Sequence, residues 1–150
     1  MVKIRVIYLP ETLKVPGKKV SMNNTLKIGL DIHGVIDTFP EKFKLLSYAL
    51  AKDGAEIHIV TGMKRNSTID KSLADAGIRF THYFSIVEHL ECSGEIIEWR
   101  GGLPYVYEDK WNSAKSVYCE KVGIDFMFDD SPTYLKTFNN IDTTYLHVIM

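Results

Sequence analysis

Short apolar runs alternate with segments of helical periodicity over most of the chain. The first run, LKIGLDI at 26–32, is largely apolar with an acid near its end, which is typical of a buried parallel strand. Four later runs share this character. The predicted strands are 26–32, 56–60, 80–84, 124–128 and 143–149. Strands that alternate with helices indicate an α/β fold: a Rossmann-like three-layer sandwich whose mostly parallel sheet has helices on both faces.

The segments between these strands carry apolar residues at helical spacing. Phe43, Leu46 and Leu50 mark a first helix that follows Pro40 and ends at Gly54. The other predicted helices contain Ile69, Leu73 and Ala76; then Val117, Tyr118 and Val122 behind a cap at Asn112 or Ser113; and last a short turn from Pro132. Each helix therefore connects two strands, as parallel pairing requires.

Residues at about 86–109 interrupt the alternation after the third strand. Within them, two short strands at 95–99 and 103–107 flank Arg100-Gly101-Gly102, so the sequence predicts a small β-hairpin insertion. The aromatic residues of this hairpin either pack on the domain or stack on a ring of a substrate, and packing is the expected role. These aromatic residues are Trp99, Tyr105 and Tyr107.

Residues 1–25 break the pattern of the rest of the chain. Residues 2–9 alternate like a strand, and Pro10 and Pro16 punctuate the segment that follows. The sequence leaves open whether this segment is a hairpin on the domain edge or a loose arm. We therefore expect one domain, with an N-terminal strand or arm at 1–25 and an α/β core at 26–150.

Composition and charge narrow the classes of protein. Of 150 residues, 45% are hydrophobic and 25% are charged, which is an ordinary globular balance. The net charge of −1 gives no overall attraction to nucleic acid or to an anionic membrane. No apolar run approaches the roughly 20 residues that span a bilayer. Cys92 and Cys119 have no C-x-x-C partner, as expected of free thiols, so the sequence predicts a soluble cytoplasmic protein without a membrane partner.

Three of the predicted strands end in residues that carry chemistry. Asp31-Ile32-His33-Gly34 lies at the end of the first strand, Thr61-Gly62 follows the second, and Asp129-Asp130 follows the fourth. Lys115 is expected in the first turn of the helix before the fourth strand. Parallel strands bring their carboxyl ends to one edge of the sheet, where ligands bind in open α/β folds. We therefore expect carboxylates, a hydroxyl and a cation to converge at that edge.

This order of motifs resembles that of the haloacid dehalogenase (HAD) superfamily. Its members carry Asp-x-Asp-Gly-(Thr/Val) after the first strand, Thr or Ser after the second, then a Lys, and paired acids after the fourth. Asp31-Ile32-His33-Gly34-Val35, Thr61, Lys115 and Asp129-Asp130 follow that order from about residue 26 to the C-terminus. The resemblance implies a HAD-like fold with a small cap or none, and a phosphatase that hydrolyses phosphomonoesters.

The resemblance also implies a magnesium site and a nucleophile. Asp31 is the implied nucleophile, which attacks phosphorus to form an aspartyl-phosphate. Mg²⁺ relieves the repulsion between that carboxylate and the phosphate. The implied oxygen ligands are Asp31, the backbone carbonyl of His33, and Asp130 or Asp129, with Asp130 favoured as the direct ligand.

Further residues are implied to bind the transferred phosphoryl group. Thr61 and the amide of Gly62 hydrogen-bond its oxygens, and Lys115 neutralises charge on the nucleophile and the phosphate. Lys110 competes with Lys115 for this role, and Lys64 is less well placed. A small insertion leaves such a site open to bulky substrates or covered by a neighbouring subunit in a homo-oligomer. The implied partner is a phosphorylated nucleotide, nucleic-acid end or small metabolite.

Position 33 departs from the family pattern. The second acid of the first motif serves as general acid and base, and here that position is His33. An imidazole changes its protonation near neutral pH and performs the same proton transfers. The substitution keeps a second class of function open, in which the domain binds a phosphorylated ligand without turnover. A phosphorylated receiver domain is a third candidate, although its paired acids would follow the first strand.

The remaining polar residues have ordinary structural explanations. An Asp that ends a strand is often a turn former, and Asp129-Asp130-Ser131-Pro132 is also a helix-start signal. The histidines outside position 33 are expected to pack in the domain or lie at its surface, because none shows a zinc-ligand spacing with Cys or Glu. These histidines include His58, His82 and His89.

Overall fold

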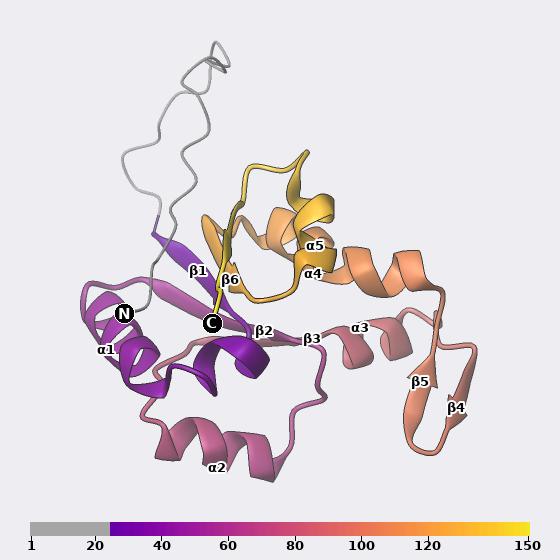
Figure 1. The fold of residues 1–150 in the computed structure, drawn as a ribbon, viewed down its shortest axis with the longest axis horizontal. Coiled ribbons are helices and arrows are strands. Elements are labelled where there is room, and N and C mark those ends of the chain that lie inside the picture. Colours follow the sequence, from indigo (N-terminus) through magenta and orange to yellow (C-terminus); the bar gives the residue numbers. More distant parts are fainter. Residues whose placement is uncertain (1–24) are drawn as a thin grey trace.

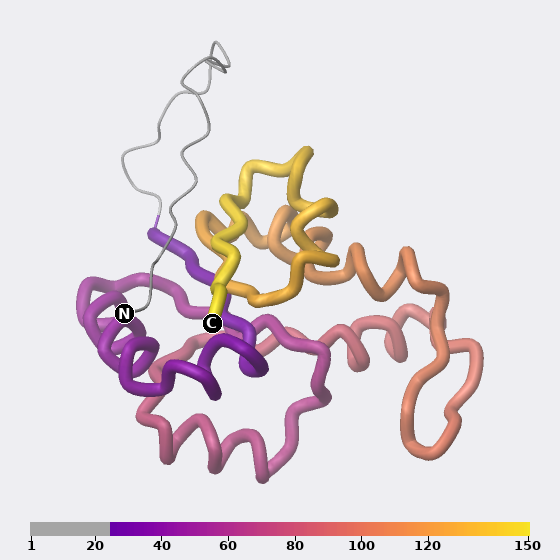
Figure 2. Tube along the Cα trace, viewed as in Figure 1, coloured from indigo at the N-terminus to yellow at the C-terminus, as the bar shows by residue number. Residues whose placement is uncertain are grey.

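The computed structural model describes residues 25–150 (Figure 1). The arm predicted at 1–25 lies outside the described residues, apart from Thr25. The Cα trace in Figure 2 shows residues 25–150 as one unit, in which helical turns lie on both sides of the central strands. The predicted core at 26–150 therefore corresponds to the part of the chain that the structure describes.

Five parallel strands form the central sheet in the order β3-β2-β1-β6-β7. They are β1 (Lys27–Leu30), β2 (Glu56–Thr61), β3 (His82–Ser85), β6 (Phe126–Asp129) and β7 (Thr144–His147). Counted along the chain, the parallel strands run 3-2-1-4-5. The predicted α/β class with a parallel sheet is confirmed, and this order is that of a Rossmann-type sheet. A receiver has the order 2-1-3-4-5, so the receiver alternative is wrong.

Helices cover both faces of this sheet (Figure 1). They are α1 (Pro40–Lys52), α2 (Ser67–Asp75), α3 (Ile86–Cys92), α4 (Glu108–Val122) and α5 (Pro132–Leu135), with a short turn η2 (Lys136–Phe138). Phe43 of α1 and Leu73 of α2 pack with Ile57 and Ile59 in one core cluster. Ala114 of α4 lies in a second core cluster, formed with apolar side chains of β2, β3 and β6 and with α3. The two clusters hold the three layers together by burying apolar surface.

The segment after the third strand differs from its prediction. Helix α3 lies where no helix was predicted, and the strand before it is 82–85 rather than 80–84. The Ser85 hydroxyl accepts a hydrogen bond from the Glu88 amide at 3.2 Å and so caps the helix. Ser-x-x-Glu is a capping-box pattern that the sequence carries, and Ile86 and Leu90 bury one face. A local helix signal was therefore present and overlooked.

The predicted hairpin is present but shorter than expected. It consists of β4 (Glu98–Arg100) and β5 (Leu103–Tyr105), which pair antiparallel. In Figure 1 it projects beyond α3 and α4. Its aromatic side chains are exposed, so the expected packing role is wrong. The exposed fractions are 49% for Trp99, 45% for Tyr105 and 64% for Tyr107.

Helix α4 begins earlier than predicted. It starts at Glu108 instead of Asn112 or Ser113, with Tyr107 as its N-cap residue. Glu108 and Asp109 in the first turn favour this start, because carboxylates stabilise the positive end of the helix dipole. Lys115 therefore lies about two turns past the start of the helix, and its predicted place in the first turn is wrong.

Cys92 is exposed and Cys119 is buried, and both are free thiols. None of the helices within residues 25–150 is long and apolar enough to cross a membrane.

Candidate active site

The carboxyl ends of β1 and β6 meet at the point where the strand order reverses. Leu30 pairs with Phe128 in register, and the Asp31 amide donates to the Phe128 carbonyl at 3.0 Å. This pairing places Asp31 beside Asp129 as the two strands end. One carboxylate oxygen from each of Asp31, Asp129 and Asp130 lies within 4.8 Å of the others. Ligands of open α/β sheets bind at such a switch point.

Lys115 reaches this edge from α4 and lies between two of the carboxylates. Its Nζ is 2.8 Å from Asp31 Oδ2 and 2.5 Å from Asp129 Oδ2, and its side chain is 1% exposed. The competing candidates lie at the surface: Lys110 pairs with Glu95 and Lys64 with Glu91. Lys115 is therefore the only one of the three candidate lysines in contact with the Asp31 carboxylate.

Burial dominates the electrostatics of this cluster. It raises the pKa of Asp31, and the charge of Asp129 acts in the same direction, while Lys115 opposes both. Burial also works against the charge on Lys115, but the two carboxylates outweigh it and raise the pKa of that ammonium. Lys115 thus stays protonated, and the cluster keeps an excess of negative charge that a cation would neutralise.

Asp129 and Asp130 have different surroundings. Asp129 is fully buried, and its Oδ1 accepts a hydrogen bond from the Ser131 amide at 2.9 Å while Oδ2 is held by Lys115. Asp130 is partly exposed and lies against Gly34, where an added Cβ would come within 2.1 Å of its Cγ. Both Asp129 oxygens are therefore engaged, whereas the Asp130 carboxylate faces the loop after β1.

A tight turn, η1 (Ile32–Ile36), carries the residues after Asp31 over the sheet edge. Gly34 adopts a φ of 72°, a left-handed conformation that a side chain would strain. Its amide donates to Asp37 Oδ1 at 2.8 Å, which closes the turn. Val35 and Ile36 are buried beneath the turn and anchor it. The turn presents the His33 side chain to solvent.

His33 has a carboxylate partner that sequence reasoning missed. Its Nδ1 lies 3.0 Å from Asp37 Oδ2, and its Nε2 lies 2.8 Å from Met63 Sδ. The side chain is 66% exposed at the rim of the site. A carboxylate that accepts from Nδ1 fixes the orientation of the ring. The signal in the sequence was the four-residue spacing of His33 and Asp37, which one turn of chain brings together.

Thr61 and Gly62 extend the site along the end of β2. Thr61 is 1% exposed. Gly62 lies against Trp111, because an added Cβ would be 3.2 Å from Cζ2 of that ring. Trp111 in turn donates from Nε1 to the Tyr134 hydroxyl at 2.9 Å, and the Tyr134 ring lies over the Lys115 ammonium. Trp111 and Tyr134 thus form an aromatic wall of the site, and no pattern along the chain singled out either residue.

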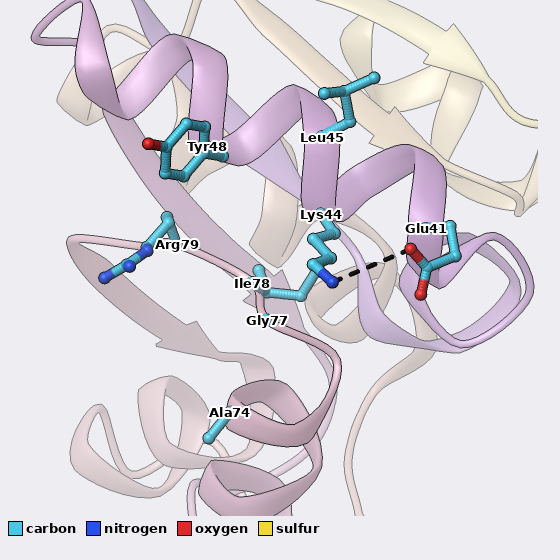
Figure 3. Close-up of a pocket in the computed structure, with 8 residues that line it drawn as sticks. All are labelled: Glu41, Lys44, Leu45, Tyr48, Ala74, Gly77, Ile78 and Arg79. Carbon is cyan, nitrogen blue, oxygen red and sulfur yellow. Dashed lines mark ion pairs between the residues drawn. The ribbon is translucent and has the colours of Figure 1, made fainter.

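A hollow of about 860 Å³ lies on another part of the molecule (Figure 3). It lies between α1 and the segment that leads into β3, and none of the predicted site residues lines it. Its lining residues are Glu41, Lys44, Leu45, Tyr48, Ala74, Gly77, Ile78 and Arg79. The side chains at the strand ends therefore lie outside this hollow.

Comparisons with known proteins assign this chain to no family. Neither the family models, nor the curated proteins, nor the solved structures gave a match. Function is therefore argued from the geometry and chemistry of the site itself.

Proposed function

We propose that this protein is a Mg²⁺-dependent phosphomonoesterase of HAD type that works through an aspartyl-phosphate. The observation that supports this most is the contact of the buried Lys115 with both Asp31 and Asp129 at the switch point of the sheet. A buried lysine shared by two carboxylates neutralises part of their charge and leaves the site suited to a cation and a phosphate.

The donor set fits Mg²⁺. Asp31, Asp130 and the backbone carbonyl of His33 offer oxygen atoms, which Mg²⁺ prefers. Asp129 does not serve as a direct ligand, because Lys115 and the Ser131 amide occupy both of its oxygens; it holds Lys115 in place instead. Gly34 allows Asp130 to approach the turn, because any side chain at position 34 would occupy the place of that carboxylate. When bound, the ion would offset the repulsion between the Asp31 carboxylate and the substrate phosphate.

In the first step an oxygen of Asp31 attacks phosphorus. The new O–P bond forms as the bond between phosphorus and the leaving oxygen breaks, and His33 donates a proton to that oxygen. Lys115 stabilises the charge on the phosphoryl group throughout, and Thr61 donates its hydroxyl to a phosphoryl oxygen. The products are the free alcohol and a phosphorylated Asp31.

In the second step water attacks the same phosphorus. His33 accepts a proton from the water, the bond from Asp31 to phosphorus breaks, and phosphate leaves. Asp37 assists both steps by holding Nδ1 of His33 at 3.0 Å, which orients the ring. This carboxylate partner favours turnover over binding alone, because a residue that only binds ligand has no need of an oriented imidazole.

The test is hydrolysis of an aryl phosphate with and without Mg²⁺. We expect turnover that requires Mg²⁺ and falls by about 10⁴-fold or more in Asp31→Asn, because the nucleophile is lost. Asp75→Asn is the matched control: Asp75 is an exposed partner of Lys71, remote from the strand ends, and its variant should retain wild-type turnover.

His33 provides the second arm of this experiment. We expect His33→Ala to lose about 10²- to 10⁴-fold in turnover, the usual contribution of a general acid and base. His33→Asp should restore activity by returning a carboxylate to that position. A wild type that is inert while His33→Asp gains turnover would overturn the hydrolase and leave a domain that binds phosphorylated ligands.

A further inference from the structure

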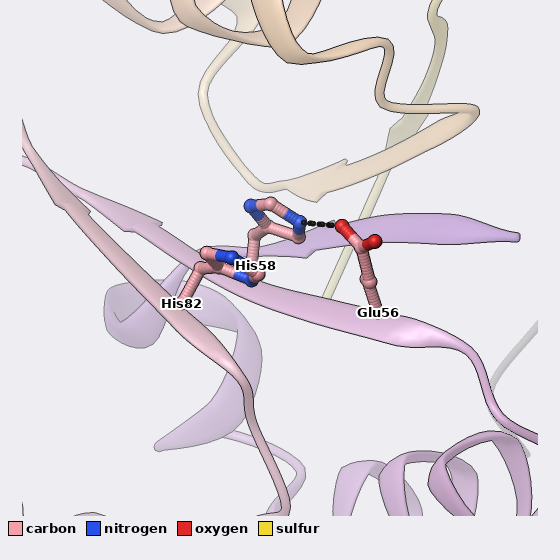
Figure 4. Close-up of side chains that lie close together, drawn as sticks. All are labelled: Glu56, His58 and His82. Carbon is pink, nitrogen blue, oxygen red and sulfur yellow. Dashed lines mark hydrogen bonds and ion pairs between the residues drawn. The ribbon is translucent and has the colours of Figure 1, made fainter. Parts of the chain in front are cut away.

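A second cluster of ligand-type side chains lies on one face of the sheet, away from the strand-end carboxylates. His58 of β2 pairs in register with His82 of β3, and Glu56 precedes His58 by two residues. Residues two apart on a strand share a face, so the three side chains project on the same side. One ligand atom from each lies within 4.8 Å of the others (Figure 4).

We propose that Glu56, His58 and His82 bind a divalent transition-metal ion of the Zn²⁺ class. Two imidazoles and one carboxylate are a donor set that suits Zn²⁺, Co²⁺ and related ions, and suits Mg²⁺ poorly. Three protein ligands leave the fourth position to water. Because His82 belongs to an edge strand, the ion would tie β3 to its neighbour β2 and stabilise that side of the sheet.

Both imidazoles already have the outer partners that metal-binding histidines use. His58 Nδ1 lies 2.7 Å from the Tyr118 hydroxyl of α4, and His82 Nδ1 lies 2.8 Å from Thr81 Oγ1. Such bonds fix the ring and leave Nε2 to the ion. Thr81 donates its own proton to the Ile57 carbonyl, so it accepts from His82 Nδ1–H and leaves Nε2 of His82 unprotonated.

The cluster is open to an ion from one side only. His58 is 2% exposed, whereas His82 lies at the surface and the Glu56 side chain is 33% exposed. An ion would therefore meet His82 and Glu56 first and reach the buried imidazole last.

Binding requires two local adjustments. The rings of His58 and His82 are stacked with centroids 4.2 Å apart and an interplanar angle of 9°, and the lone pair of each lies in its own plane. The exposed His82 ring therefore turns out of the stack to share an ion with His58. Nε2 of His58, which lies 3.3 Å from Glu56, would bind the ion without a proton, so the ring would carry its proton on Nδ1 and donate it to the Tyr118 hydroxyl.

Lys27 is a built-in competitor for this ion. Its Nζ lies 3.3 Å from Glu56 Oε2, the same oxygen that faces His58. A cation there weakens the pull of the carboxylate on a metal. Removing the charge of Lys27 should therefore tighten metal binding, an effect that an unrelated surface histidine site would not show.

The test is a Co²⁺ titration of the whole chain followed by visible absorption. Excess Mg²⁺ is present, so that the strand-end carboxylates do not take up Co²⁺. We expect one equivalent to bind with the intense bands of four-coordinate Co²⁺, and Zn²⁺ to displace it. His82→Ala should weaken binding by at least about 10-fold, and Lys27→Met should tighten it.

Two controls separate this site from other histidines and from the carboxylates. His89→Ala removes an exposed histidine of α3, and Asp130→Asn removes a strand-end carboxylate; both should bind Co²⁺ as the wild type does. The proposal is overturned if the wild type binds no Co²⁺ in excess Mg²⁺, or if His82→Ala and His89→Ala bind it equally well. Neither outcome depends on whether the protein is a phosphatase.

Discussion

Two clusters of charged side chains on the same sheet resemble each other in size and differ in almost everything else. Each brings three ligand atoms within 4.8 Å, and each includes a lysine that contacts a carboxylate. One cluster, at the ends of β1 and β6, has only oxygen donors. The other, on the paired strands β2 and β3, has two imidazoles and one carboxylate. Hard oxygen donors select Mg²⁺, whereas imidazoles select Zn²⁺ and its neighbours.

The difference teaches what each place in an α/β sheet allows. At a strand end the chain leaves the ladder, so a turn such as η1 can bring a backbone carbonyl and a glycine against a carboxylate. Within paired strands the backbone is committed to hydrogen bonds, and only side chains are available. A strand end is therefore suited to a site that binds a ligand with both backbone and side-chain groups. A strand face is suited to a site that holds an ion with side chains alone.

The two lysines provide the largest expected effect. Lys115 is 1% exposed between two carboxylates, whereas Lys27 is 30% exposed beside Glu56. Lys115→Met leaves two buried carboxylates without a cation and should lower the free energy of unfolding by about 3–5 kcal/mol. Lys27→Met breaks a largely solvated pair and should lower it by about 1 kcal/mol or less. Urea unfolding of both variants measures this.

Equal losses of unfolding free energy in Lys115→Met and Lys27→Met would contradict the difference drawn between the two clusters. A small loss in Lys115→Met would mean that the Asp31 and Asp129 carboxylates are solvated enough to dispense with the ammonium. The strand-end cluster would then lack the buried charge on which its proposed chemistry depends. Adding Mg²⁺ sharpens the measurement, because an ion that binds Asp31 and Asp130 should restore part of the stability lost in Lys115→Met.

Gly34 provides a smaller effect confined to one cluster. Gly34→Ala places a Cβ at φ 72° and within 2.1 Å of the Asp130 Cγ, so it should lose about 1–2 kcal/mol of stability and most Mg²⁺ affinity. Gly54→Ala, at φ 85° with open space around it, carries the same backbone strain without the contact. Calorimetric Mg²⁺ titration of both checks this. Unchanged Mg²⁺ affinity in Gly34→Ala would remove Asp130 from the proposed metal site.

The strand-end cluster could be predicted because its signals are local. Asp31, Thr61 and Asp129 each end an apolar run, and parallel strands bring such ends together whatever the details of packing. The strand order could not be predicted from the sequence, because alternating helices and right-handed crossovers allow both 3-2-1-4-5 and 2-1-3-4-5. Lys115 was harder, because its reach to Asp31 depends on where α4 begins, and that start was misplaced by several residues.

The strand-face cluster could not be predicted, because it depends on register. Glu56 and His58 are local, but His82 joins them only when β2 and β3 pair with His58 opposite His82. No zinc-ligand spacing is visible along the chain, and the expectation that these histidines pack in the domain or lie at its surface agrees with a buried His58 and an exposed His82. Asp37 was missed for a different reason: its partnership with His33 requires the left-handed Gly34 turn, which shortens the distance between them.

The smallest expected effect is on the pH dependence of the free energy of unfolding, which has opposite signs for the two clusters. Burial raises the pKa of Asp31 above 3.8, so the stability this group contributes is complete below that pH and is lost as the pH rises through its folded value. Burial lowers the pKa of His58 below 6.5, so its contribution is complete above that pH and is lost as the pH falls.

Unfolding from about pH 3 to about pH 8 in chelator, compared with Asp31→Asn and His58→Gln, separates the two dependences. The stability difference between wild type and Asp31→Asn should shrink as the pH rises, and that between wild type and His58→Gln should shrink as it falls. Curves of wild type and variant that run parallel would mean that the group is not buried as described. Saturating Mg²⁺ favours the ionised Asp31 and should cancel the first dependence while leaving the second, since the imidazoles offer Mg²⁺ no suitable donors.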